Sequence, residues 1–112
     1  MAHDEVLAQS IRDLTEAETD ISERRMFGGV AFLAGGNLAL AASGQGGLLV
    51  RIDPSEAEAL LQARAVSPME MRGREVDGWI RVEGAAVPTA RQLEPWVRRG
   101  LARARSLPAR SR

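Results

Sequence analysis

The sequence lacks cysteine, lysine and tyrosine, and it has a single histidine, His3. Without cysteine the chain forms no disulfide, no thiolate metal site and no thiol nucleophile. No spacing of serine, histidine and acidic residues is typical of nucleophilic catalysis, and none is typical of a metal site. We therefore expect a protein that is not an enzyme and that binds no cofactor and no metal.

Long apolar runs are also absent. No run approaches the roughly 20 residues that a helix needs to cross a bilayer, and the N-terminus is acidic where a signal peptide would be basic. With 45% hydrophobic and 27% charged residues, the composition is that of an ordinary globular protein. We expect a cytoplasmic protein without a membrane partner, folded as a single domain over residues 1–112.

The charges are distributed unevenly along the chain. All 15 basic residues are arginine, they match 15 acidic residues, and the formal net charge is zero. Residues 1–23 hold seven acids and one arginine, residues 24–90 hold seven of each, and residues 91–112 hold seven arginines and one acid. The net charge of these segments therefore runs from −6 through zero to +6. The molecule is polarised by charge unless folding brings the two ends together.

The first segment predicts an amphipathic helix. Leu7, Ile11 and Leu14 recur at helical spacing within residues 4–17, which gives the helix one narrow apolar face. The acids in its first turn suit the positive end of the helix dipole. The polar residues 18–23 that follow are expected to form a loop.

Two further helices are indicated by capping signals. Asp53 suits an N-cap before a helix that begins with proline, and we expect this helix over Pro54–Arg64. A capping-box pattern in residues 88–92 opens a last helix. Pro95 either kinks that helix or makes it start effectively at residue 94, and the tail over residues 108–112 is expected to fray.

Short apolar runs between glycine-rich turns predict the strands. The expected strands cover residues 25–33, 38–42, 48–52, 69–72 and 79–83, and the first run is interrupted by Gly28 and Gly29. The order of elements is thus α-βββ-α-ββ-α. Because helices and strands do not alternate regularly, this order predicts an α+β fold with an antiparallel sheet of about five strands.

Four blocks of sequence resemble one known family. They are Arg24-Arg25-Met26-Phe27-Gly28-Gly29, Leu49-Val50-Arg51-Ile52-Asp53, Met69-Glu70-Met71-Arg72-Gly73-Arg74 with Gly78-Trp79, and Trp96-Val97-Arg98-Arg99-Gly100-Leu101. Together they cover about residues 5–107 and resemble the bacterial TfoX/Sxy N-terminal domain family. The resemblance implies an α+β fold. In the competence regulators of the family it also implies a role in transcription of DNA-uptake genes alongside the cyclic-AMP receptor protein.

The competence function is not expected to transfer whole. The regulators that have it carry a second, C-terminal domain, which we do not expect here. The family has no established catalytic residues to carry over to this sequence. What the resemblance implies for this chain is therefore a stand-alone interaction domain with a possible link to transcription.

The first candidate site is formed by Arg24, Arg25, Gly28 and Gly29. Glycine permits close approach of the backbone and arginine binds phosphate or carboxylate through two hydrogen bonds, so these residues suit an anion or partner site. The alternative is structural, with the glycines at a bulge or strand crossing and the arginines solvated or paired with acids. We favour the structural alternative.

The second candidate site is the set of C-terminal arginines Arg98, Arg99, Arg103 and Arg105. These residues suit contacts to the phosphates of a nucleic acid or to an acidic partner. Alternatively, they complement the negative end of the helix dipole and pair with the acidic first helix. We rank pairing within the molecule or at a dimer interface ahead of nucleic-acid binding, because a domain of zero net charge is a poor general DNA binder.

A third region, Met71–Arg74 together with Trp79, offers arginines beside an aromatic ring. This combination is found on nucleic-acid surfaces and in cation–π pairs. Neighbouring acids neutralise the region, however, and a tryptophan at an apolar position is more often part of the core.

The sequence as a whole predicts a non-catalytic interaction module that resembles the TfoX N-terminal domain and acts in transcriptional regulation. A protein partner or self-association is the expected mode of action. Two alternatives stay open: direct binding of nucleic acid through the last helix, and binding of a small acidic ligand, or an enzymatic activity, near Arg25–Gly29.

Overall fold

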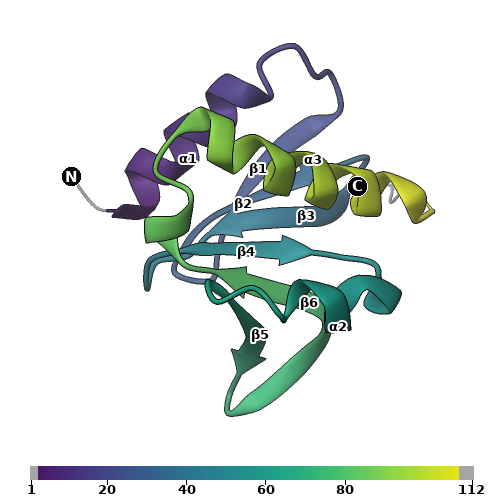
Figure 1. Cartoon of the computed structure of the whole chain (residues 1–112). Helices are drawn as coiled ribbons and strands as arrows, with labels where there is room; N and C mark the ends of the chain where they lie inside the picture. Colours follow the sequence, from purple (N-terminus) through teal and green to yellow (C-terminus); the bar gives the residue numbers. More distant parts are fainter. Residues whose placement is uncertain (1–2, 109–112) are drawn as a thin grey trace.

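An antiparallel sheet of six strands lies at the centre of the computed structural model, which describes residues 3–108 (Figure 1). The strands pair in the order β1-β2-β3-β4-β6-β5. They are β1 (Ile21–Met26), β2 (Gly29–Ala34), β3 (Asn37–Ala42), β4 (Leu48–Arg51), β5 (Val66–Met71) and β6 (Arg74–Val82). The helices are α1 (His3–Leu14), α2 (Ala57–Leu60) and α3 (Ala90–Ser106), with 3₁₀ turns at Pro54–Glu56 and Gly84–Ala86. The expected α+β fold is confirmed.

The helices lie against one face of the sheet, which we call the covered face. Figure 1 shows α1 and α3 side by side over the strands. Along each strand alternate residues face opposite sides of the sheet, and the covered face receives the larger aliphatic and aromatic side chains. Its buried members include Val30, Phe32, Leu40, Val50 and Ile80 from the sheet, Ile11 from α1, and Leu93, Val97 and Leu101 from α3.

The opposite face, which we call the open face, has a separate apolar cluster. Its buried members are Ala31, Ala41, Leu49 and Met69, and no residue of the described helices joins them. Larger side chains pack around this floor of small residues, namely Met26, Phe27, Leu38, Val76 and Trp79. The open face is therefore apolar although no described helix covers it.

The first strand was not expected. Residues 18–23 were predicted as a loop and residues 25–33 as one strand, yet β1 and β2 are two strands joined by a tight turn at Phe27 and Gly28. Both turn residues have positive φ, 59° at Phe27 and 69° at Gly28, as a type I′ hairpin turn requires. A bulky residue rarely adopts this conformation, which is why the turn was missed and six strands form where about five were expected.

The middle helix is shorter than predicted. Asp53 caps the 3₁₀ turn that precedes it, since its Oδ1 accepts a hydrogen bond from the backbone N–H of Ser55 at 3.0 Å. The α-helix itself begins only at Ala57 instead of Pro54 and has no side-chain cap. The helix then ends at Leu60 instead of Arg64. The chain must turn early because Val66 already begins β5, where it pairs with β6.

The last helix begins where the capping pattern predicts. Thr89 Oγ1 accepts from the N–H of Gln92 at 3.3 Å and donates to Gln92 Oε1 at 2.9 Å. The helix runs from Ala90 through Pro95, so it does not start at residue 94. Residues 109–112 of the predicted frayed tail lie outside the described part of the chain.

α3 is held close to the sheet at two points. A Cβ built on the buried Gly100 would lie 2.6 Å from the carbonyl oxygen of Ala39, so only glycine allows this approach. The buried Asn37 donates from Nδ2 to the carbonyl oxygens of Ala104 at 3.2 Å and Pro108 at 2.9 Å. These bonds tie the start of β3 to the last turn of α3 and to the residue that follows its C-cap.

Candidate functional site

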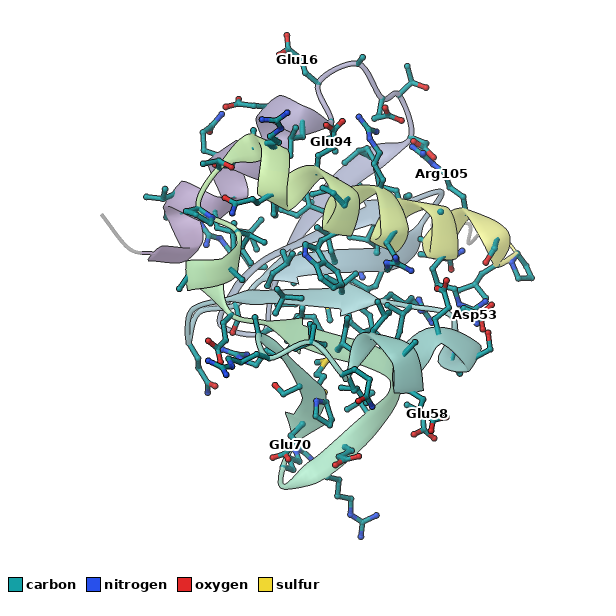
Figure 2. All side chains as sticks on the ribbon, viewed as in Figure 1. Glu16, Asp53, Glu58, Glu70, Glu94 and Arg105 are labelled. Atoms are coloured by element: carbon teal, nitrogen blue, oxygen red, sulfur yellow. The ribbon has the colours of Figure 1, made fainter. Side chains whose placement is uncertain are left out.

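The acidic N-terminal segment and the basic last helix meet in the fold. Arg98 Nη1 donates to Glu18 Oε2 at 3.1 Å, and its Nη2 donates to the carbonyl oxygen of Leu14 at 3.3 Å and to Glu94 at 3.4 Å. Figure 2 shows Arg105 reaching from α3 toward the segment that follows α1. The two ends of the charge gradient therefore neutralise each other in part on the covered side of the molecule.

Arg105 makes the strongest of these contacts. Its Nη2 lies 2.6 Å from Asp20 Oδ1 and 2.8 Å from Glu18 Oε1. Hydrogen bonds from Arg105 hold the pKa of both carboxyls below their usual values, and the same bonds raise the pKa of Arg105. Both bonds favour the charged forms, so these side chains stay ionised as a cluster at neutral pH.

Arg99 and Arg103 lie along a hollow of about 480 Å³ between α3 and the turn that begins at Asp53. Arg99 pairs with Glu56 at 3.1 Å and lies over the ring of Trp96, 5.9 Å from its centroid. Arg103 has no such carboxylate partner in the described part of the chain, and its buried Nε has no acceptor there. Of the four predicted arginines, three thus have ion pairs within the chain.

Arg24 and Arg25 lie on opposite faces of the sheet. Arg25 pairs with Glu5 of α1 at 3.2 Å, whereas Arg24 lies opposite Ala31 and so faces the open side. They do not share a pocket, and the anion site predicted from both together has no common geometry in the structure.

Gly28 and Gly29 serve the packing of two hairpin turns. A Cβ on the buried Gly29 would lie 2.0 Å from the carbonyl oxygen of Ala42, and one on Gly44 would lie 2.2 Å from that of Gly28. The N–H of Gly44 donates to the carbonyl oxygen of Phe27 at 3.2 Å. The close approach of the β1–β2 and β3–β4 turns accounts for the glycines.

The same approach carries Phe27 over the open face. Its ring lies 6.1 Å from that of Trp79 at an interplanar angle of 56°, a tilted aromatic contact. Arg51 lies over the Trp79 ring at 5.8 Å and donates from Nη1 to the carbonyl oxygen of Leu38 at 3.1 Å. Segments that are far apart in the sequence therefore build one aromatic group on this face.

A hollow of about 640 Å³ lies beside this group. Phe27, Leu49, Met69 and Met71 line it, and Met71 is 47% exposed. A neighbouring hollow of about 660 Å³, between α1 and the β3–β4 turn, contains no aromatic or methionine side chain in its lining. The open-face hollow is therefore the one that combines apolar, polarisable and aromatic groups.

Among the described residues, arginines outnumber acids on the open side of the sheet. Strand register places three arginines on this face, where Arg24 lies opposite Ala31, Arg81 opposite Leu49 and Arg51 opposite Trp79. A fourth arginine, Arg74, lies opposite Met71 in the β5–β6 hairpin. Glu23 lies opposite Phe32 on the covered face and pairs with Arg12 of α1. Glu70, at the far end of the molecule from Glu94 (Figure 2), is the acid among the residues that line the hollow.

Sequence reasoning missed most of this surface. The region around Arg24 and the Met71–Arg74 region with Trp79 were named as separate candidates, but nothing in the spacing joins the two regions. The available signal was the run of small residues in β2 and β3, since Ala31 and Ala41 alternate with large residues that face the helices. Such alternation predicts that one face of the sheet carries smaller side chains than the other, but it does not predict which other residues lie on that face.

No described helix is long and apolar enough to cross a membrane. Within residues 3–108 there is also no group of three or more histidine, cysteine or acidic side chains placed to hold a metal ion.

The fold and the surface define a small α+β module with helices on one face of an antiparallel sheet and an apolar, arginine-bearing surface on the other. A family model described as the TfoX N-terminal domain matches residues 13–104. The chain belongs to this family, which confirms the resemblance predicted from the sequence blocks. The comparison with curated proteins and the comparison with solved structures each gave no match.

Proposed function

We propose that this chain is a non-catalytic interaction module that binds a protein partner on the open face of its sheet. The observation that carries the proposal is the apolar cluster around Phe27 and Trp79, which no described helix covers. Exposed apolar patches with a polar rim are typical of protein interaction sites. By its family, we propose that the partner belongs to the control of transcription and that the interaction takes place in the cytoplasm.

The backbone at Phe27 supports this choice of surface. A bulky residue with φ of 59° is strained, and strain of this kind costs about 1–3 kcal/mol and tends to cluster at binding sites. Here the strained residue places an aromatic ring against Trp79 at the margin of the hollow. Met71 and Met69 add flexible, polarisable side chains that adapt to a partner's shape.

The α3 arginines support a partner site less well. Arg98, Arg99 and Arg105 already hold carboxylates of the chain, so a phosphate or an acidic partner would have to displace these pairs. A partner that binds the apolar cluster of the open face would not have to displace these ion pairs. We therefore assign the interaction to the open face and a stabilising role to most of α3's charge.

The proposal that the module is non-catalytic rests on the sequence. His3 is the only histidine, and there is neither cysteine nor tyrosine. The groups most often used for acid–base and nucleophilic catalysis are thus scarce or absent.

Position-specific photo-cross-linking in the source cell tests the proposed surface. A photoreactive amino acid replaces Met71 on the open face or, as a control, Glu58 on α2, which is exposed on the helical side. We expect a defined protein adduct from position 71 that is absent from position 58 and is lost when Phe27→Gly is added. Equal adducts at both positions, or none at position 71, would contradict the proposal.

The cross-linked protein is then purified and its affinity for the chain is measured by calorimetry. We expect Met71→Glu to weaken binding by at least about tenfold, or about 1.4 kcal/mol. Unchanged affinity would show that the open face is not the binding surface.

A further inference from the structure

We infer that the open face takes an apolar protein segment flanked by acidic residues. This inference rests on the proposed function and adds the chemistry of the partner. The starting observation is that strand register places Arg24, Arg51 and Arg81 on this face and Arg74 beside Met71, whereas Glu70 is the one acid among the residues that line its hollow.

Two of these arginines are fixed by the chain itself. Arg51 is held by the carbonyl oxygen of Leu38 and by the Trp79 ring, and Arg81 donates from Nη2 to the carbonyl oxygen of Gly46. Both therefore present positive charge from defined positions beside the apolar floor. Fixed guanidinium groups lose less conformational freedom when a carboxylate binds.

The other two arginines are exposed and carry no ion pair within the described residues. They are Arg24 on β1 and Arg74 on β6. On the covered side, in contrast, Arg12, Arg25 and Arg98 all hold carboxylates. Arg24 and Arg74 are thus available to carboxylates from outside, which arginine binds through two parallel hydrogen bonds.

A second copy of the chain is a poor occupant of this face. Face-to-face pairing through a twofold axis brings the same surface of both copies together. It would place the arginines of one open face against those of the other, and like charges in contact oppose association.

A single-stranded nucleic acid is also a poor occupant. Binding of this kind relies on aromatic rings whose faces are free to stack on bases. Arg51 lies over the Trp79 ring, and Phe27 packs against the same ring at a tilt. Leu49, Met69 and Met71, which also line the hollow, fit apolar side chains better than sugars and phosphates.

Two synthetic peptides test the charge preference. Both carry the same leucine and phenylalanine positions, and their remaining positions are glutamate in one and lysine in the other. Because the chain has two tryptophans and no tyrosine, Trp96→Phe leaves Trp79 as the reporter of binding by fluorescence. We expect the acidic peptide to bind at least about tenfold more tightly than the basic one.

Charge reversal on the open face should invert this preference. In the Arg24→Glu/Arg74→Glu variant we expect the basic peptide to bind more tightly than the acidic one. Arg64→Glu/Arg91→Glu is the matched control, since it changes the net charge equally at exposed positions after α2 and in α3. The control should keep the preference of the unaltered chain.

Three results would overturn the inference: equal affinity for both peptides, binding of neither peptide, or displacement of the acidic peptide by single-stranded oligothymidylate. These results are distinct from failure of the proposed function. If a partner is cross-linked at position 71 but the two peptides bind equally well, the open face remains the proposed interaction surface, and only its preference for acidic segments is refuted.

Discussion

Phe32 and Phe27 are the two phenylalanines of the chain, and they lie on the two faces of the sheet under opposite conditions. Phe32 is 1% exposed, belongs to the core beneath the helices and lies in a regular strand. Phe27 is half-buried, belongs to the open-face cluster and has a left-handed backbone. Phe32 stabilises the fold from an unstrained strand backbone, whereas Phe27 is held by the surrounding turns in a strained backbone conformation.

The charges differ between the faces in the same way. On the helical side arginines and acids meet in pairs, as at Arg98–Glu18 and Arg105–Asp20. On the open side Arg24 and Arg74 form no ion pair among the described residues, and Glu70 is the one acid that lines the hollow. The formal net charge of zero therefore does not describe the open face, where arginines outnumber acids among the described residues.

The largest expected effect is a difference in unfolding free energy between variants of the two phenylalanines. Phe32→Ala leaves a cavity in the covered core and should cost about 3–5 kcal/mol of unfolding free energy. Phe27→Gly loses ring contacts but relieves a strain of about 1–3 kcal/mol, so its net cost should stay within about 1 kcal/mol. Urea denaturation of both variants measures the difference. Equal losses would mean that the open-face ring is an ordinary core residue.

The next effect concerns the close packing of α3 against β3 at Gly100. Gly100→Ala would normally stabilise a helix, but here the added Cβ meets the carbonyl oxygen of Ala39. We expect a loss of about 1–3 kcal/mol, as in other overpacked interiors, measured as a lower thermal midpoint. Ala102→Gly, at an exposed site of the same helix, is the reference and should cost about 1 kcal/mol. A stabilised Gly100→Ala variant would show that α3 can move away from the sheet.

A smaller effect is expected from the paired charges of the helical side. The Asp20 and Arg105 side chains are each 38% exposed, so water screens the pair, and Asp20→Asn should cost no more than about 1 kcal/mol at neutral pH. Asp77→Asn, which removes a carboxylate without an ion pair among the described residues, should cost less.

The same pair predicts a direction for the pH dependence. Because folding lowers the pKa of Asp20 and Glu18, their stabilisation is present above the unfolded pKa values and is lost as pH falls through the folded ones. The unaltered chain should lose stability as pH falls below about 4–5, where the unfolded carboxyls begin to protonate. Asp20→Asn should lose less over that range in thermal melts, and a parallel loss would rule out this contribution.

The smallest effect tests Arg103, which lies on the helical side and forms no ion pair within residues 3–108. The buried Nε of Arg103 has no acceptor in the described part of the chain, and a buried donor without a partner costs about 1–3 kcal/mol. Arg103→Met keeps much of the apolar stem and removes this donor, so stability should be unchanged or slightly higher in urea. Arg105→Met, which breaks two ion pairs, should be less stable than the unaltered chain. A clear loss in Arg103→Met would indicate an unseen polar role for its guanidinium.

The class of fold and most turns could be predicted from the sequence because their signals are local. Thr89 caps α3 and Asp53 caps the 3₁₀ turn that precedes α2, and Gly35-Gly36 forms the turn expected between β2 and β3. Strand β1 could not be recognised, since its sequence does not alternate between apolar and polar residues. Glu23 and Arg25 face the helical side as ion-pair partners of Arg12 and Glu5 instead of entering a core.

The open face depends on contacts that no local pattern contains. Phe27 meets Trp79 only because β1 and β6 belong to the same sheet. The preference of this face for arginine likewise follows from register, since Arg24, Arg51 and Arg81 are scattered over the sequence. The composition gives the number of arginines, but only the pairing of the strands shows that these three lie on the same face of the sheet.

The contacts between the two ends of the chain also have a kinetic consequence. Arg98 and Glu18 are 80 positions apart and Arg105 and Asp20 are 85 apart, whereas the β1–β2–β3–β4 hairpins join near neighbours. Because distant contacts close large loops, we expect them to form late in folding. Removing them should speed unfolding and leave the folding rate nearly unchanged. The ion pairs between α3 and the segment after α1 then contribute to the lifetime of the folded state and not to the speed of its formation.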